Sequence, residues 1–98
     1  MFAKKHPTER GILLAVSDEE LLGRSFSEKS FRLEITEDFY GGQRVSEEEL
    51  KPLMKEAYIL NIVGKKSVEI AVKLGLVNKE EILVIGGIPH AQSIIIRE

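Results

Sequence analysis

The chain opens with two apolar-containing segments, residues 2–5 and residues 12–16, on either side of a polar connection. This connection contains Pro7 and Gly11, which interrupt regular structure, and it has the length of a hairpin turn. Residues 12–16 are apolar at every position, which is typical of a strand covered on both faces. The pattern therefore predicts an N-terminal β-hairpin whose second strand lies inside a sheet.

Short elements are expected in the segment that follows. Ser17 or Asp18 is suited to cap a helical turn through residue 22, before Gly23 stops it. Residues 31–35 alternate apolar and charged side chains, as a strand does when one of its faces contacts water. This segment therefore supplies a third strand, and a further short strand is expected near Arg44 and Val45.

A longer helix is indicated after this point. Ser46 and Glu49 have the spacing of a capping box, in which each side chain bonds a free backbone N–H of the other residue. The next apolar residues recur every three or four positions: Leu50, Leu53, Met54, Ala57 and Leu60. Residues 61–64 are predicted to break this helix, and a second helix starts at Lys65 or Lys66 and ends before Gly75. These two helices would form a helix hairpin.

The C-terminal part returns to strand-like patterns. Residues 82–85 predict a buried strand, residues 86–89 a bend, and residues 91–96 the last strand. The order of elements predicts an α+β fold in a single domain, residues 1–98. We expect the N-terminal hairpin and the C-terminal strands to form a mixed or antiparallel sheet, packed by the central helix hairpin.

Composition narrows the function classes. With 43% hydrophobic and 31% charged residues, the chain is typical of a soluble globular protein, and its many Glu and Lys lean toward a heat-adapted composition. The absence of cysteine excludes disulfides, thiolate nucleophiles and cysteine zinc sites. The N-terminus lacks the apolar run of a signal peptide, so a cytoplasmic location without a membrane partner is expected. The two histidines lie far apart and the chain has no thiol, so a zinc site is not predicted, whereas a Mg²⁺ site made of carboxylates stays open. No cofactor is predicted.

The net charge of −2 conceals an uneven distribution of charge. Residues 50–79 contain six lysines and two glutamates, which gives this region a local charge of +4. Acidic residues gather instead at the predicted helix starts, where the helix dipole accounts for them. The near-neutral total therefore does not argue against a polyanionic partner.

The basic region contains a candidate phosphate site. Gly64 precedes a helix start whose free N–H groups favour an anion, and Lys65, Lys66 and Ser67 would add further donors. The stretch is similar to the helix-hairpin-helix motif of nucleic-acid-binding proteins, although Ile62 stands where that motif has its first glycine. The alternative interpretation is that Gly64 only ends a helix and that the lysines form a solvated face.

A second candidate is the glycine-rich bend near the C-terminus. Gly86 and Gly87 would place His90 and Gln92 beside exposed backbone donors. Histidine exchanges a proton near neutral pH, so His90 is the residue that would act as acid or base, although no nucleophile is identifiable. The alternative is a structural turn with a hydrogen-bonded histidine.

Phe39 and Tyr40, beside Gly41 and Gly42, form the third candidate. These aromatic rings would offer a stacking surface for a nucleic-acid base. The alternative is that the two aromatic residues pin a loop to the core. Both interpretations remain open at the level of the sequence.

The chain resembles, from end to end, the small archaeal proteins of the domain of unknown function 424 family. The residues that carry this resemblance are 14–23, 39–42, 61–64 with Ser67 and Val68, and 86–92. The resemblance implies an archaeal cytoplasmic protein of single-domain size. The family has no established activity, so the resemblance assigns no catalytic residue.

Three hypotheses follow for the function. The leading one is a non-enzymatic module associated with RNA or a ribonucleoprotein, which contacts phosphate through the helix start at Gly64 to Ser67 and is flanked by the loop at Gly86 to Gln92. The alternative is a small enzyme or binding protein that uses His90 and the Gly86–Gly87 loop to act on or bind an anionic or phosphorylated metabolite. The third is an oligomerising protein adaptor in which the apolar residues 94–96 pair as an edge strand with a partner or a second copy.

Overall fold

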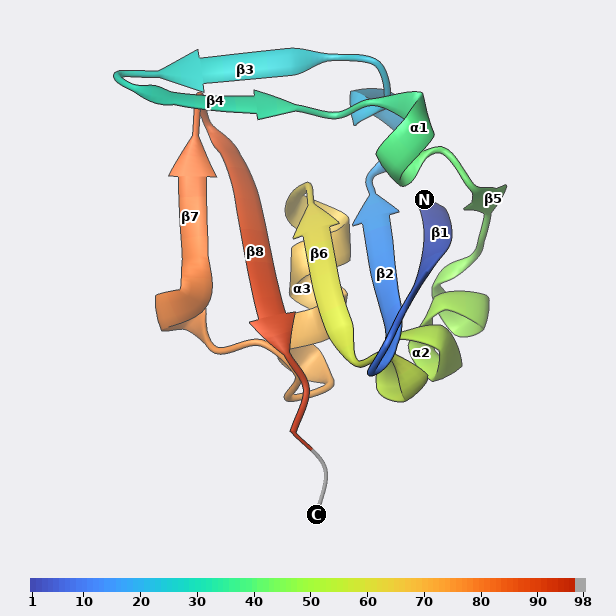
Figure 1. Ribbon diagram of the computed structural model, residues 1–98. Coiled ribbons are helices and arrows are strands. Elements are labelled where there is room, and N and C mark those ends of the chain that lie inside the picture. Colours follow the sequence, from blue (N-terminus) through green and yellow to red (C-terminus); the bar gives the residue numbers. More distant parts are fainter. Residues whose placement is uncertain (97–98) are drawn as a thin grey trace.

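A mixed six-stranded sheet organises the computed structural model, which describes residues 1–96 (Figure 1). The strands are β1 (Phe2–Thr8), β2 (Gly11–Ser17), β5 (Gln43–Arg44), β6 (Ile59–Val63), β7 (Ile82–Ile85) and β8 (Ile88–Ile94). They lie in the order β5-β1-β2-β6-β8-β7; β2 and β6 are parallel, and the other neighbours are antiparallel. The predicted α+β class and mixed sheet are confirmed, and β2 lies inside the sheet as expected.

The predicted helix hairpin is wrong. The first helix, α2 (Glu47–Glu56), starts with the expected capping box between Ser46 and Glu49 but ends before Ala57. The chain then forms β6, which pairs with β2 on one side and with β8 on the other. Leu60 fits the three-to-four-residue spacing of the helix only by coincidence. It belongs to a buried apolar run around Ile62 that pairs with a strand on each side. The second helix, α3 (Lys65–Lys73), follows β6 directly.

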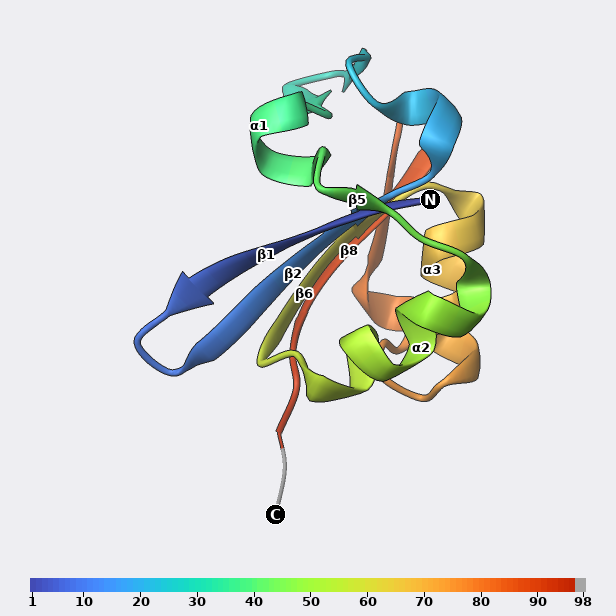
Figure 2. The ribbon, with the colours of Figure 1, turned by 90° about the vertical axis from the view of Figure 1, so that its right-hand side faces the viewer.

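The two faces of the sheet are covered differently. Helices α2 and α3 pack on one face, where the larger core cluster contains residues of both helices together with Leu14, Val16 and Ile62 of the strands (Figure 2). The other face is covered only in part, by the 3-10 turn η1 (Glu19–Leu21), the helix α1 (Glu37–Tyr40) and the hairpin of β3 (Ser25–Glu28) and β4 (Phe31–Glu34). Ala15 and Val63 lie in this second cluster, as the alternation of side chains along a strand requires.

Several boundaries differ from the prediction. The strand expected at residues 31–35 is β4, but its partner β3 was not predicted. The last strand covers Ile88–Ile94 rather than residues 91–96. It lies between β6 and β7, and the N–H of Ile95 donates to the carbonyl of Tyr58 beside β6. The register of β8 with β7 covers only Ile88 to Ala91, so pairing of residues 94–96 with a partner stays a prediction. None of the helices within residues 1–96 is long and apolar enough to cross a membrane.

Candidate functional site

The carboxyl ends of the parallel strands β2 and β6 bring the start of α3 next to Asp18. The side chain of Asp18 accepts hydrogen bonds from the backbone N–H of Ser67 at 2.8 Å, from the Ser67 hydroxyl at 2.7 Å and from the Lys66 N–H at 3.0 Å. Asp18 is only 2% exposed. A carboxylate at this position is favoured by the positive end of the helix dipole. The anion that the α3 start holds is therefore a side chain of the protein itself.

Gly64 is required for this close approach. It caps the N-terminus of α3 with φ +108, so the interpretation of Gly64 as the end of a helix is wrong. A Cβ atom at this position would lie 2.2 Å from Cγ of Asp18, and L side chains rarely adopt this φ. The N–H of Gly64 donates to the carbonyl of Pro89 in β8 at 2.9 Å. The glycine turn that the sequence singles out therefore holds the carboxylate of Asp18, and its contact with an external phosphate stays a prediction.

The predicted phosphate donors thus divide into two groups. The N–H groups of Lys66 and Ser67 and the Ser67 hydroxyl already have an anionic partner, which a phosphate would have to displace. The side chains of Lys65 and Lys66 are exposed, and within residues 1–96 neither forms an ion pair. Of the predicted phosphate donors, these two ammonium groups are therefore the ones without an anionic partner within residues 1–96.

His90 lies on β8 opposite Val63, next to the α3 start. Its Nδ1 lies 2.9 Å from the carbonyl oxygen of Ile62, which fits a ring that donates from Nδ1. Burial lowers the pKa of His90, and the bond to Ile62 opposes this shift. Burial therefore favours the neutral form of the ring. A role for His90 in acid-base chemistry stays a prediction.

Gly86 and Gly87 form the exposed turn between β7 and β8. The N–H of Gly86 donates to a carboxylate oxygen of Glu28 in β3 at 3.0 Å, so this donor also has an internal anion. Gln92 is exposed on β8, two residues beyond His90 and on the same face of the sheet. The hydrogen bond between Gly64 and Pro89 joins the α3 start to the β7–β8 hairpin, so the two predicted glycine loops are near neighbours.

Tyr40 and Phe39 anchor α1 to the sheet. Tyr40 is 3% exposed, and its hydroxyl donates to Oδ1 of Asn61 at 2.5 Å. Burial raises the pKa of Tyr40 to about 12. The ring of Phe39 stacks on His6 with the ring centres 4.7 Å apart, and His6 Nε2 lies 2.7 Å from the Phe39 carbonyl. The geometry matches the packing interpretation, and sequence reasoning missed the partners His6 and Asn61 because they lie on other strands.

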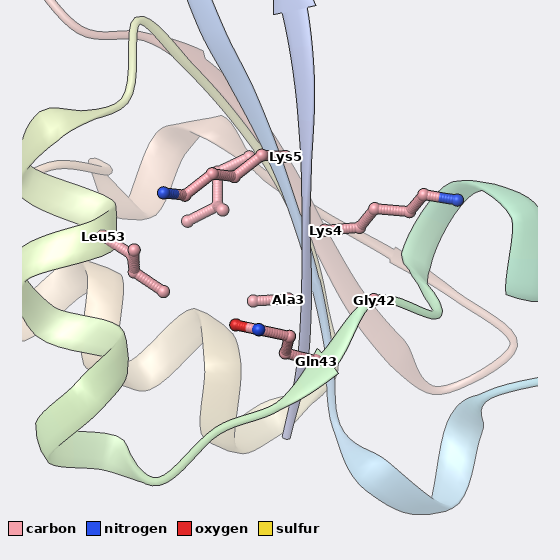
Figure 3. A pocket seen from close by; sticks show the side chains of 7 residues that line it. Ala3, Lys4, Lys5, Gly42, Gln43 and Leu53 are labelled. Carbon is pink, nitrogen blue, oxygen red and sulfur yellow. The ribbon is translucent and has the colours of Figure 1, made fainter.

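A small cleft of about 280 Å³ lies where β1 and β5 face α2 (Figure 3). Lys5, Gln43 and Leu53 contribute side chains to it, so it combines one cation, one amide and apolar walls. Within residues 1–96 no three His, Asp or Glu side chains lie close enough together to hold a metal ion.

A larger open feature than this cleft lies at the other end of the sheet. A groove of about 740 Å³ runs between α3 and the edge strand β7. Its walls are apolar: Val68, Val72, Ile82, Val84 and Pro89. Its rim carries three lysines and one glutamate, which gives a net charge of +2: Lys65, Lys73, Lys79 and Glu69. On the strand itself Leu83 is 43% and Val84 52% exposed.

The antiparallel register determines which backbone groups of β7 face outward. In such a ladder, consecutive residues direct their N–H and C=O groups alternately to one neighbour and to the other side. Because the carbonyl of Pro89 bonds to Gly64 beside β6, His90 is the residue of β8 that faces β7, opposite Leu83. Leu83 therefore bonds inward, and the N–H and C=O groups of Val84 point to the free edge. Sequence reasoning missed this edge because an all-apolar strand looks buried.

Comparisons with known proteins give a family but no activity. Residues 6–96 match the family described as "Protein of unknown function (DUF424)", so the chain belongs to this family, as its sequence motifs predicted. The chain is also similar to a crystal structure of an uncharacterized conserved protein from Methanopyrus kandleri, with 30% sequence identity and a TM-score of 0.78. That similarity covers 99% of this chain and 93% of the other. No curated protein matches the chain.

Proposed function

We propose that this DUF424 protein is a non-enzymatic interaction module that binds a protein partner along the free edge of β7. The observation that carries the proposal is an apolar edge strand whose outward backbone groups, at Val84, bond to none of residues 1–96. Strand addition uses such groups for main-chain hydrogen bonds, and it uses a neighbouring groove to select side chains. Val84 combines the two features, because its backbone groups point to the free edge and the residue forms part of the groove wall.

The surroundings of β7 extend this surface. The hairpin of β3 and β4 crosses the end of β7, and its turn projects beyond this strand (Figure 1). Phe31, the first residue of β4 after that turn, is 53% exposed. Exposed large apolar side chains on a strand, at a hairpin turn and along a groove are typical of protein interfaces rather than of a solvated surface. This form of the adaptor hypothesis uses β7 in place of residues 94–96.

Site-specific photo-crosslinking in an archaeal host tests the proposal. A photoreactive amino acid at position 84 is expected to capture a specific protein, whereas the same group at Lys5 in β1 serves as the matched control. The captured protein is then purified and titrated against wild type and Val84→Pro, which removes the outward N–H without breaking the ladder to β8. The affinity of Val84→Pro for the captured protein should be roughly tenfold lower than that of the wild type. Equal binding by Val84→Pro would overturn the proposal.

RNA binding is the second candidate function, because Lys65 and Lys66 expose ammonium groups that form no ion pair within the described residues. Contact with two or three phosphates would give weak, salt-sensitive affinity. Fluorescence anisotropy with structured and single-stranded RNA across a salt series tests this candidate. Lys65→Glu/Lys66→Glu should abolish binding and Lys51→Glu/Lys55→Glu should retain it. RNA affinity that changes neither with the salt concentration nor in Lys65→Glu/Lys66→Glu would exclude phosphate contact at the α3 start.

A further inference from the structure

The chemistry of the α3–β7 groove restricts the partner more narrowly than the free edge does. A strand added beside β7 would alternate its side chains between the two faces of the sheet. The side chains on the α3 face would enter the groove, whose walls are the apolar residues of α3, β7 and β8. Its volume of about 740 Å³ accommodates several branched or aromatic side chains. The added strand must therefore carry apolar residues at alternate positions.

The rim of the groove adds a charge requirement. Lys65 stands at the α3 start and Lys79 in the 3-10 turn η2 (Lys79–Glu81), which precedes β7. Lys73 pairs with Glu69 at 3.0 Å, so this pair neutralises itself. Lys65 and Lys79 are both exposed, and neither has an ion pair within residues 1–96. Carboxylates that flank the apolar residues of a partner would complement these two cations.

A second copy of the chain does not meet this requirement. Antiparallel pairing of β7 with its copy about a two-fold axis would place both α3 helices on the same face. The lysines of the two rims would then face each other, and like charges in such positions are unfavourable. The walls of the groove also lack the aromatic rings on which nucleic-acid bases stack.

We infer that the partner contributes an extended acidic segment that adds to β7 as a seventh strand, with apolar side chains in the α3–β7 groove and carboxylates at Lys65 and Lys79. This inference rests on the proposed function, because it requires the β7 edge to be the binding surface. It names a peptide of defined pattern, in which apolar residues alternate and acidic residues flank them.

A display selection with random peptides about ten residues long tests the inference, because this length exceeds that of a typical strand. Peptides that bind the wild-type protein are selected, and a counter-selection against Val84→Pro removes the peptides that bind without the β7 edge. Enriched peptides should alternate apolar residues and carry an excess of Asp and Glu. Neutral or basic enriched peptides would overturn the inference and leave the proposed function standing. An absence of enrichment, or enrichment of peptides that bind Val84→Pro equally, would overturn both.

A titration with one synthetic enriched peptide then tests the rim. Lys65→Glu/Lys79→Glu should weaken binding roughly tenfold, and added salt should reduce the difference between this variant and the wild type. The matched control is Lys5→Glu/Lys55→Glu, which makes the same change of charge at the β1 side of the molecule. Equal weakening by both variants would show that only net charge matters and would overturn the assignment of the two lysines. If Val84→Pro does not fold, Val84→Asn replaces it, because this change removes an apolar side chain from the groove wall without adding a charge.

Discussion

The two edges of the sheet differ in how far they are protected against pairing with another chain. At one end, the short strand β5 pairs with β1 only at Phe2 and Ala3, so most of β1 lies at the edge. This exposed part carries Lys4, Lys5 and Pro7. At the other end, β7 contains four apolar residues and neither a charge nor a proline.

The β1 end uses the usual protection against unwanted strand pairing. Lysine and proline on an edge strand prevent another chain from adding to it. Helix α1 adds a second protection, because Nζ of Lys4 donates to the carbonyl of Asp38 at 2.6 Å and His6 stacks on Phe39. The β7 end has no counterpart of these features on its strand. The contrast supports the proposal that a partner binds at the β7 end, beside a groove with a cationic rim.

Removal of Asp18 should have the largest effect, and it should loosen α3, beside the β7 groove, before it affects the β1 end. Asp18→Ala leaves the N–H groups of Lys66 and Ser67 and a buried hydroxyl without their partner, so we expect a loss of about 2–4 kcal/mol in the free energy of unfolding. Urea denaturation measures this loss. Hydrogen exchange should accelerate in α3, which forms one wall of the groove, before it accelerates in β1.

The matched variant for this prediction is Asp38→Ala at the β1 side. Lys4 bonds to the backbone carbonyl of Asp38 rather than to its carboxylate, so this change should cost less than about 0.5 kcal/mol. Equal losses in the two variants would contradict the assignment of Asp18 as the link between β2 and α3.

An exchange of the two edge types tests the comparison directly. Lys5→Val/Pro7→Val gives the β1 edge the character of β7 and restores an outward N–H at position 7. Sedimentation velocity over a concentration series should show that this variant self-associates roughly tenfold more strongly than the wild type. Val84→Lys makes the reverse change and should not self-associate. If Lys5→Val/Pro7→Val behaves like the wild type, the lysine and the proline do not protect this edge.

The sequence predicted those features of the two ends that depend on neighbouring residues. The capping box at Ser46, the first hairpin and the apolar strand at residues 82–85 are local patterns, and the structure contains all three. The link between Asp18 and Ser67 joins positions 49 residues apart, so only the parallel pairing of β2 with β6 brings it about. Whether an apolar strand is interior or at an edge depends on strand order, which a single strand does not encode.

Tyr40 makes the β1 side sensitive to alkaline pH. Its pKa is about 12 in the folded protein against about 10 in the unfolded chain, so the stability contributed by the neutral phenol is fully present below about pH 10 and is lost as the pH rises toward 12. Tyr40→Phe should lose about 1 kcal/mol near neutral pH, because the bond to Asn61 is removed. Urea denaturation at several alkaline pH values should show a smaller difference between the two proteins. Tyr58→Phe is the control, and a constant difference for Tyr40→Phe would contradict the prediction.

His90 should make the β7 side sensitive to acid, and this effect is the smallest of the four. Burial lowers the pKa of His90 in the folded protein, so its contribution to stability is present above about pH 6.5 and is lost as the pH falls below that value. His90→Gln should therefore flatten the decrease in unfolding free energy between neutral and mildly acidic pH, as measured by urea denaturation. His6→Gln at the β1 side is the matched control and should retain that decrease. Because His90 lies opposite Leu83 in the ladder, protonation of its ring should also speed hydrogen exchange in β7 relative to β1. If both histidine variants flatten the pH dependence equally, acid sensitivity does not distinguish the two ends of the sheet.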